Sequence, residues 1–302
     1  MSHAIETMEL SRRFGPTEAV HCLTMQVPAG SVCALVGPNG AGKTTTIRLL
    51  MRLLDADAGT ARVLGTDVRR LGPDLLARIG YVSESQDLHE WMTVDDLCAY
   101  CAPFYRTWDR DLALGLCRLL DLPRNRPLRG FSRGMRMKAA LLVSLAFRPE
   151  LLVMDEPFTG LDPLVREEIS QGMLDVSGER TTFIASHEVD EIERLADHVA
   201  FIDGGRLQFM EPTNVLLARF RDVEVVFDGD ARLPASRPAT WLVAEVCGRS
   251  LRFVDSAHDE AGLAAQVAHH VPGARLAAVD PKSLRSIVVS LARASRTVHL
   301  EA

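Results

Sequence analysis

From residue 37 the chain reads Gly37-Pro38-Asn39-Gly40-Ala41-Gly42-Lys43-Thr44. This is the G-x-x-x-x-G-K-[ST] pattern of a phosphate-binding loop, in which glycines let backbone N–H groups approach an anion closely. Lys43 supplies a positive charge suited to the β- and γ-phosphates, and the hydroxyl of Thr44 can ligate Mg²⁺. Thr45 opens the next helix, whose N-terminal dipole favours the same anion. Residues 37–45 are therefore the predicted contacts of a nucleoside triphosphate.

The residues on either side of this loop predict a buried strand and a helix. Residues 31–36 are a short, mostly apolar run of the kind found in strands that are covered on both faces. Residues 45–54 follow with a helical pattern. The loop pattern alone arises by chance in roughly one in a hundred chains of this length. With the strand and the helix around it, a chance Gly-rich turn is a poor explanation.

The overall composition is that of a soluble globular protein with one or two domains. The 302 residues are 47% hydrophobic and 25% charged, as in most such proteins. The net charge of −6 argues against a general surface for nucleic acid or anionic membranes. No apolar run approaches the length of a spanning helix, about 18 residues, and the first residues do not form a secretory signal. We therefore expect a cytosolic protein.

Two further patterns have a structural and a functional interpretation. Cys98 and Cys101 have C-x-x-C spacing without a second pair, so two reduced thiols are the better interpretation than redox or zinc chemistry. His269 and His270 are adjacent, and a solvated helix face is a better interpretation than a metal site.

Strand-like runs alternate with helical ones beyond the loop. This alternation predicts an α/β core with a mainly parallel sheet, whose ligand lies at the carboxyl ends of the strands. A helical stretch begins at Thr93, with Asp96 completing a capping pair. Near Phe220 the pattern changes to strands followed by helices, which predicts a small α+β domain. The predicted core strands are 31–36, 79–82, 151–154, 181–185 and 199–202.

Polar residues that suit phosphoryl transfer to water follow two of these strands. Asp155 and Glu156 supply one carboxylate for Mg²⁺ and one that polarises the attacking water. His187, after the next strand, offers a neutral imidazole that can hydrogen-bond the γ-phosphate. A lone histidine is usually a satisfied core residue, but its place at a strand end favours the functional interpretation. Lys43, Glu156 and His187 are the predicted catalytic residues.

Together these motifs resemble the nucleotide-binding subunit of an ABC transporter, over residues 1–218. The phosphate loop alone would leave kinases and GTPases open, whereas the ordered set does not. Phe14 matches the aromatic residue that stacks on the base, although a core phenylalanine fits its pattern equally well. The remaining matches are the Walker A loop at 37–44, the signature at 131–135 with Ser132 and Gly134 facing phosphate, the Walker B strand at 151–156, the D-loop at 160–162 and the switch His187.

The resemblance implies a fold, a mechanism and partners. The fold is a P-loop ATPase core over 1–218, with a mainly parallel sheet, N-terminal antiparallel strands and a helical subdomain at about 93–147, followed by an accessory α+β domain at 219–302. Two subunits, expected to be a homodimer, meet head to tail and hold each ATP with Mg²⁺ between the loop of one copy and Ser132 and Gly134 of the other. Hydrolysis at Glu156 releases the pair, and a separate multi-span permease converts closure into transport. The subunit touches the inner face of the membrane only through that permease, and it binds no nucleic acid.

The chain departs from the common family pattern at two places. The signature has Arg133 and Met135 where glycine and glutamine are usual, a variant similar to those of ABC-2-type bacterial exporters. The usual Q-loop glutamine falls on Glu84, and Gln86 follows two residues later. We hypothesise that Glu84 faces the metal together with Thr44 and Asp155, and that Gln86 faces the permease or takes the metal role instead. The C-terminal segment resembles appendages of the same exporters, and a regulatory or dimer-bracing role is a hypothesis.

Two other functions are weighed against the transporter. A soluble ABC-type mechanochemical switch acting on ribosomes or DNA usually carries two cassettes, coiled-coil insertions or zinc sites, none of which is recognisable here. A catalytically dead regulatory subunit is disfavoured because the full set of catalytic and metal-facing residues is present: Lys43, Asp155, Glu156 and His187. The transported substrate is chosen by the permease and cannot be derived from this chain.

Overall fold

The computed structural model of the protein describes residues 2–85, 87–175, 180–234 and 236–300. The chain divides into two compact units, Met1–Met210 and Glu211–Ala302. The division precedes α8 (Thr213–Arg219), a short helix that the sequence pattern did not reveal. Each unit is described by itself below.

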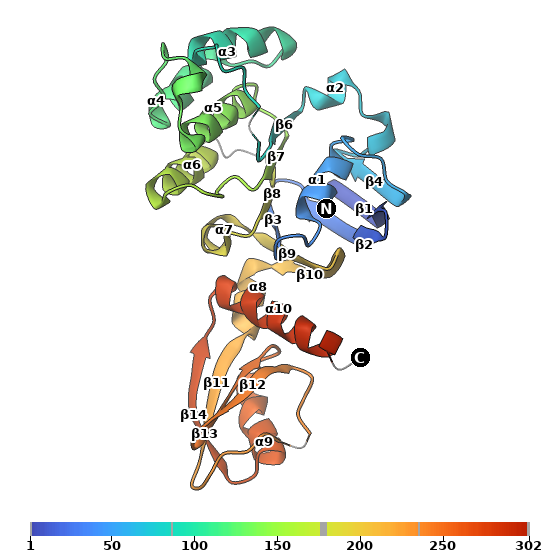
Figure 1. The fold of residues 1–302 in the computed structure, drawn as a ribbon, viewed down its shortest axis with the longest axis vertical. Helices are drawn as coiled ribbons and strands as arrows, with labels where there is room; N and C mark the ends of the chain where they lie inside the picture. The colour runs from blue at the N-terminus through green and yellow to red at the C-terminus, as the bar shows by residue number, and fades with distance from the viewer. Residues whose placement is uncertain (1, 86, 176–179, 235, 301–302) are drawn as a thin grey trace. The chain divides into compact units, whose positions relative to one another are not determined.

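The core of the first unit is a six-stranded sheet with the order β10-β9-β3-β8-β7-β6 (Figure 1). The pairs of β3 with β8 and β9, of β7 with β8 and of β6 with β7 are parallel. The predicted α/β core with a mainly parallel sheet is therefore confirmed. The strands are β3 (Val32–Val36), β6 (Ile79–Val82), β7 (Leu151–Asp155), β8 (Thr181–Ser186), β9 (His198–Asp203) and β10 (Arg206–Pro212).

A second, antiparallel sheet in this unit has the order β2-β1-β4-β5. One continuous hydrophobic cluster joins it to α1 and to the six-stranded sheet, through residues such as Leu23, Ile47 and Leu35, all fully buried. This packing fixes the position of α1, which begins at the end of the phosphate loop. The elements are β1 (His3–Phe14), β2 (Thr17–Pro28), α1 (Lys43–Leu50), β4 (Ala58–Val63) and β5 (Thr66–Asp67).

The predicted limits of the helix after the loop were wrong. Instead of running over 45–54, α1 begins at Lys43 and ends at Leu50. Arg52 adopts a left-handed conformation with φ 54°, and a residue in that conformation ends a helix. The N–H of Leu53 then bonds back to the carbonyl of Arg48. The stop is set by backbone conformation at a residue type that gives no sequence signal for it.

Helices follow the strands in the rest of this unit, and α3, α4 and α5 gather on one side of it (Figure 1). The predicted cap of α3 is confirmed, because Thr93 and Asp96 form a capping box. Ser132 caps α5 by accepting a hydrogen bond from the N–H of Met135. The helices are α2 (Pro73–Leu76), α3 (Val94–Cys101), α4 (Arg110–Leu119), α5 (Arg133–Leu145), α6 (Pro163–Asp175) and α7 (Val189–Leu195), with 3₁₀ turns at Val68–Arg70, Ala102–Phe104 and Leu128–Gly130.

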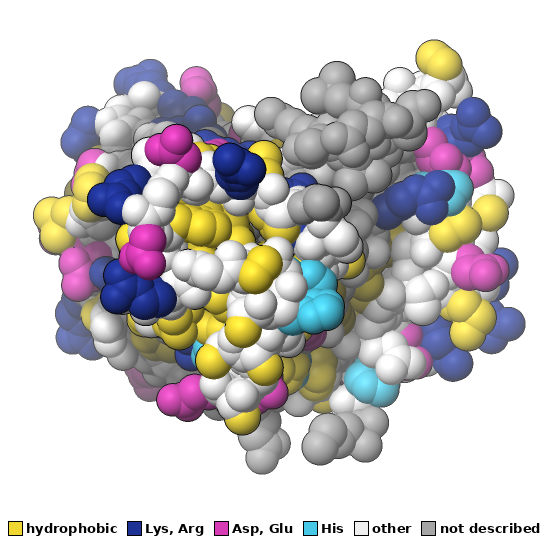
Figure 2. Space-filling model, turned by 90° about the horizontal axis from the view of Figure 1, so that it is seen from below, with side chains coloured by type: hydrophobic (Ala, Val, Ile, Leu, Met, Phe, Trp, Pro, Cys, Tyr) yellow, Lys and Arg dark blue, Asp and Glu magenta, His cyan; other side chains and the backbone are white. Residues whose placement is uncertain are grey.

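The second unit is an antiparallel sheet with the order β12-β13-β11-β14 and three helices. Trp241 stacks on Phe253 with 3.9 Å between ring centroids, and α9 covers them with Leu263 and Val267. Figure 2 shows acidic and basic side chains interspersed on the face drawn, around a hydrophobic area. Besides α8, the elements are β11 (Arg221–Phe227), β12 (Trp241–Cys247), β13 (Ser250–Asp255), α9 (Glu260–His270), β14 (Ala274–Pro281) and α10 (Leu284–Leu300).

Within the described ranges, every helix is too short or too polar to span a lipid bilayer.

Candidate nucleotide-binding site

Three neighbouring strands end at the same edge of the six-stranded sheet. In the parallel register Val36 pairs with Ser186, and Asp155 pairs with Ala185. The segments that follow these strands carry the phosphate loop, Glu156 and His187. The predicted ligand position at the carboxyl ends of the strands is therefore where these side chains meet.

Steric limits explain two glycines of the loop. A Cβ atom on Gly37 would lie 2.1 Å from the carbonyl oxygen of Ile202, and one on Gly42 would lie 2.3 Å from that of Ala19. Gly42 also has φ 103°, a conformation that L side chains rarely adopt. No other residue fits either position without moving a neighbouring strand.

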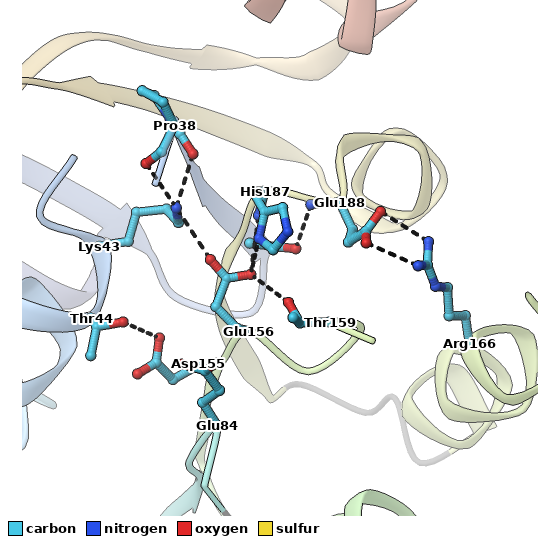
Figure 3. Close-up of polar contacts among 12 residues, drawn as sticks. Pro38, Lys43, Thr44, Glu84, Asp155, Glu156, Thr159, Arg166, His187 and Glu188 are labelled. Atoms are coloured by element: carbon cyan, nitrogen blue, oxygen red, sulfur yellow. Dashed lines mark hydrogen bonds and ion pairs between the residues drawn. The ribbon is translucent and has the colours of Figure 1, made fainter. Parts of the chain in front are cut away.

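Lys43 is buried and is held by three oxygen atoms. Its Nζ donates to the carbonyl oxygens of Gly37, at 2.9 Å, and of Pro38, at 3.2 Å. It also lies 3.2 Å from Oε1 of Glu156 (Figure 3). The ammonium is thus aimed across the loop towards the carboxylate that follows β7.

Glu156 is the centre of a hydrogen-bond cluster. Its backbone has φ 51°, and its N–H donates to the carbonyl of Ala185 at 2.8 Å, which ties the end of β7 to β8. Its Oε2 lies 2.7 Å from Nδ1 of His187, accepts the backbone N–H of the same histidine at 3.2 Å and accepts the hydroxyl of Thr159 at 3.1 Å. Sequence reasoning missed Thr159, which lies between the Walker B and D-loop motifs and has no motif position of its own.

The oxygen atoms predicted to face a metal lie beside this cluster. The hydroxyl of Thr44 donates to Oδ1 of Asp155 at 3.0 Å (Figure 3). Burial raises the pKa of the Asp155 carboxyl to about 6, and the carboxylates of Glu156 and Glu84 add to the rise. A buried carboxylate among other anions is stabilised by a cation. One hydroxyl and one or two carboxylates fit Mg²⁺, which usually completes its shell with water and phosphate oxygens.

Lys43, Thr44, Glu156, Thr159 and His187 line one cleft of about 420 Å³. Glu84 lines it too, and it also lines a neighbouring hollow of about 520 Å³ that Asp155 and Arg133 share. Its Oε1 is 3.7 Å from the guanidinium of Arg133. Gln86 lies outside the described residues. The cleft is lined by Ala19, Asn39, Gly40, Gly42, Lys43, Thr44, Thr45, Glu84, Glu156, Thr159 and His187.

Six predicted nucleotide contacts, all within the described ranges, are not among the lining residues: Gly37, Pro38 and Ala41 of the loop itself, and Phe14, Ser132 and Gly134 outside it. Phe14 is 46% exposed at the end of β1, and the guanidinium of Arg12 lies 5.1 Å from its ring centroid. Ser132 is the cap of α5, and Gly134 is buried, where a Cβ atom would lie 2.8 Å from Cγ1 of Val165.

A bidentate ion pair lies beside the cluster and was also missed by sequence reasoning. Arg166 on α6 donates from Nη1 and Nη2 to the two carboxylate oxygens of Glu188, each at 2.9 Å. Glu188 directly follows His187. The two partners are 22 residues apart, so neither has a local signal that would identify the other.

Comparison with known proteins identifies the family of this chain. The family model for the ABC transporter matches residues 20–159. The daunorubicin/doxorubicin resistance ATP-binding protein DrrA of Streptomyces peucetius is 35% identical over 79% of this chain and 77% of its own length. The Nod factor export ATP-binding protein I of Cupriavidus pinatubonensis is 33% identical over 67% of this chain and 64% of its own length. The glycine betaine uptake system ATP-binding protein YehX of Escherichia coli is 31% identical over 82% of this chain and 77% of its own length.

A solved structure described as the ATP binding subunit of an ABC transporter has the same fold. It superposes with a TM-score of 0.65 over 71% of this chain and 92% of that chain, at 24% identity. The P-loop ATPase fold predicted from the motifs is confirmed by this likeness. Subunits of this family bind and hydrolyse ATP and work with a separate membrane permease. The fold, the loop with its carboxylates and the similarity to DrrA together show that this chain belongs to the ATP-binding subunits of ABC transporters.

Proposed function

We propose that this protein is the ATPase of a bacterial exporter and works as a homodimer at the inner face of the cell membrane, bound there through a multi-span permease. The main support for this proposal is that Lys43, Glu156 and His187 lie together in one cleft of about 420 Å³. Residues 1–218 form the ATPase domain and 219–302 an accessory domain in this proposal.

Each side chain of the cleft has a role in this proposal. The loop amides and Lys43 bind the β- and γ-phosphates, since backbone N–H groups and a buried ammonium are aimed at the same space. Glu156 accepts a proton from the attacking water, and His187 hydrogen-bonds the γ-phosphate. Both must first exchange their mutual contact of 2.7 Å for contacts with water and phosphate.

Mg²⁺ is held in this proposal by Thr44, Asp155 and Glu84, together with phosphate oxygens and water. It supplies positive charge to the phosphates during transfer. The hydroxyl and carboxylate that face each other at 3.0 Å support this assignment.

The second copy completes the site. The N-terminus of α5, a helix of 13 residues, presents Ser132 and Gly134, and a helix N-terminus favours the γ-phosphate of the partner copy. Phe14 is exposed and is available to stack on the adenine base. ATP then stabilises the closed pair, and hydrolysis shifts the population back to the open pair.

Export is proposed because of the signature variant at Arg133 and Met135 and the second unit. The similarity to a Nod factor export protein supports it. Identity does not decide the direction, since the uptake protein YehX is almost as similar. The accessory unit is proposed to brace the dimer or to regulate it.

A trapped variant tests the proposal. Glu156→Gln is expected to bind ATP while hydrolysing it slowly, so its complexes accumulate. The tagged variant is expressed in its own host, and the membranes are solubilised with ATP and Mg²⁺. A stoichiometric multi-span protein should then copurify, and its sequence gives the transport direction. Lys43→Ala, which cannot hold ATP, is the control. Ribosomal proteins or nucleic acid without a membrane partner would refute the transporter proposal and favour the soluble switch.

A further inference from the structure

Arg166 uses its guanidinium to hold two segments that are separate in sequence. Nη1 and Nη2 bond the carboxylate of Glu188 at 2.9 Å each (Figure 3). Nε donates to the carbonyl of Leu161 at 3.0 Å. The side chains of Arg166 and Glu188 are only 21% and 27% exposed. A forked, partly buried pair of this kind is both stronger and more directional than an exposed ion pair.

The two segments that Arg166 holds are those that contact Glu156. Glu188 directly follows His187, whose Nδ1 lies 2.7 Å from Oε2 of Glu156. Leu161 is two residues after Thr159, whose hydroxyl donates to the same oxygen at 3.1 Å. Thr159 and His187, whose side chains contact Oε2 of Glu156, therefore each lie within two residues of a group that Arg166 binds.

We propose that Arg166 is a positioning residue for hydrolysis. It sets the separation of the segments 159–161 and 186–188, so that the hydroxyl of Thr159 and the backbone N–H of His187 hold the Glu156 carboxylate in one orientation. The inference rests on the proposed role of Glu156 as the base. A general base must lie within hydrogen-bond reach of its proton, and small misplacements of such a group reduce the rate strongly.

A second pair in the same unit provides a matched control. Arg78 donates from Nε and Nη2 to the two carboxylate oxygens of Glu150, at 2.6 and 2.7 Å. Arg78 precedes β6 and Glu150 precedes β7, so this pair lies at the amino ends of the strands. It has the same chemistry as the Arg166 pair, at the opposite edge of the sheet from the cleft.

The test compares Arg166→Met, Arg166→Lys and Glu188→Gln with Arg78→Met in the full chain. For each protein we would measure kcat, the Kd for ATP, the Tm and the side-chain NMR signals of His187. Arg166→Met should lower kcat about tenfold, leave the Kd within about twofold and shift the His187 signals. Arg166→Lys keeps the positive charge but cannot form the two parallel hydrogen bonds to Glu188, so it should recover only part of the rate. Arg78→Met should change only the Tm.

Two results would overturn the inference. One is an unchanged kcat in Arg166→Met, and the other is an equal loss in Arg166→Met and Arg78→Met. If Arg166→Met does not fold, the kcat of Glu188→Gln tests the inference instead. This substitution keeps the shape of the side chain and weakens its two hydrogen bonds with Arg166, and an unchanged kcat would overturn the inference. Glu156→Gln, measured alongside, separates the two proposals: if it retains the wild-type rate, the proposed base is wrong, whatever Arg166 does.

Discussion

Lys43 and Glu156 form a buried ion pair, with 3.2 Å between Nζ and Oε1. The cation of the phosphate loop is thus bound to the carboxylate proposed as the base. In the proposed mechanism, a γ-phosphate that reaches Lys43 would compete with Glu156 for it and free the carboxylate for water. Substrate binding and activation of the base would then be coupled through this one contact.

Glu156→Gln should therefore change two quantities in opposite directions. We expect kcat to fall at least about 100-fold, because the amide cannot accept the proton. We expect the affinity for ATP to rise a few-fold, because the neutral amide competes less for Lys43. ATPase assays and equilibrium nucleotide binding check both, with Glu150→Gln, outside the cleft, as the control. Weaker ATP binding in Glu156→Gln would contradict the coupling.

Asp155→Asn should stabilise the protein at neutral pH in the absence of Mg²⁺. The folded-state pKa of Asp155 is raised from 3.8 to about 6, so the folded state binds this proton more tightly than the unfolded state. That contribution to stability is present below about pH 4 and is lost as the pH rises through 6. Asparagine does not titrate, so its advantage should grow across this window to on the order of 1–3 kcal/mol.

Urea unfolding at several pH values measures this difference for Asp155→Asn. Mg²⁺ with ATP should raise the stability of the wild type much more than that of the variant. A difference that does not vary between pH 4 and pH 7 would show that ionisation of Asp155 carries no cost in the folded state.

Thr159→Val should reduce kcat about three- to tenfold, since it removes one hydrogen bond from Oε2 of Glu156. Thr159→Ser keeps the hydroxyl and should retain most of the rate. The Kd for ATP should be similar in both variants. Equal rates for the valine and serine variants would mean that the hydroxyl has no part in placing the carboxylate.

Glu84→Gln tests whether this carboxylate faces the metal. We expect the Mg²⁺ concentration for half-maximal ATPase activity to rise about three- to tenfold, because the charge of a hard oxygen ligand is lost. Arg133→Met removes the ion-pair partner, 3.7 Å away, and leaves the carboxylate, so its Mg²⁺ dependence should stay close to that of the wild type. If Glu84→Gln leaves the activity and its Mg²⁺ dependence unchanged, the metal role of Glu84 is wrong.

Gly37→Ala should destabilise the first unit by roughly 1–3 kcal/mol. The new Cβ would lie 2.1 Å from the backbone oxygen of Ile202, and β9 cannot move without disturbing the sheet. Gly115→Ala in α4 is the matched control, since nothing lies within 4 Å of its added Cβ and alanine favours a helix. Chemical denaturation of both variants measures the contrast.

The sequence was most informative where local chemistry and strand ends coincide. Lys43, Asp155, Glu156 and His187 each follow a recognisable apolar strand, so their meeting at one sheet edge could be predicted from the α/β pattern alone. The spacing of the glycines also predicted the loop, because the lack of space for a Cβ atom restricts the residue type at that position itself.

What escaped prediction depends on contacts between distant residues. Thr159 and the pair of Arg166 with Glu188 have no spacing rule, because their partners are chosen by the tertiary fold. The end of α1 depends on the left-handed conformation of Arg52, which an arginine does not signal. The ion pair of Glu84 with Arg133 joins two departures from the family pattern that, taken separately, gave no reason to pair them.

The backbone hydrogen bond from Glu156 to Ala185 has a consequence for how the centre tolerates change. Because β7 and β8 are adjacent strands, the distance between base and histidine is set by the interstrand spacing of the sheet, about 4.8 Å. Among the described residues, α3 and α4 contribute no side chain to the cleft, so these two helices, unlike α6 with Arg166, can diverge in sequence without altering that distance. The sheet thus keeps the backbones of the proposed base and of the histidine at a constant separation while more distant helices change.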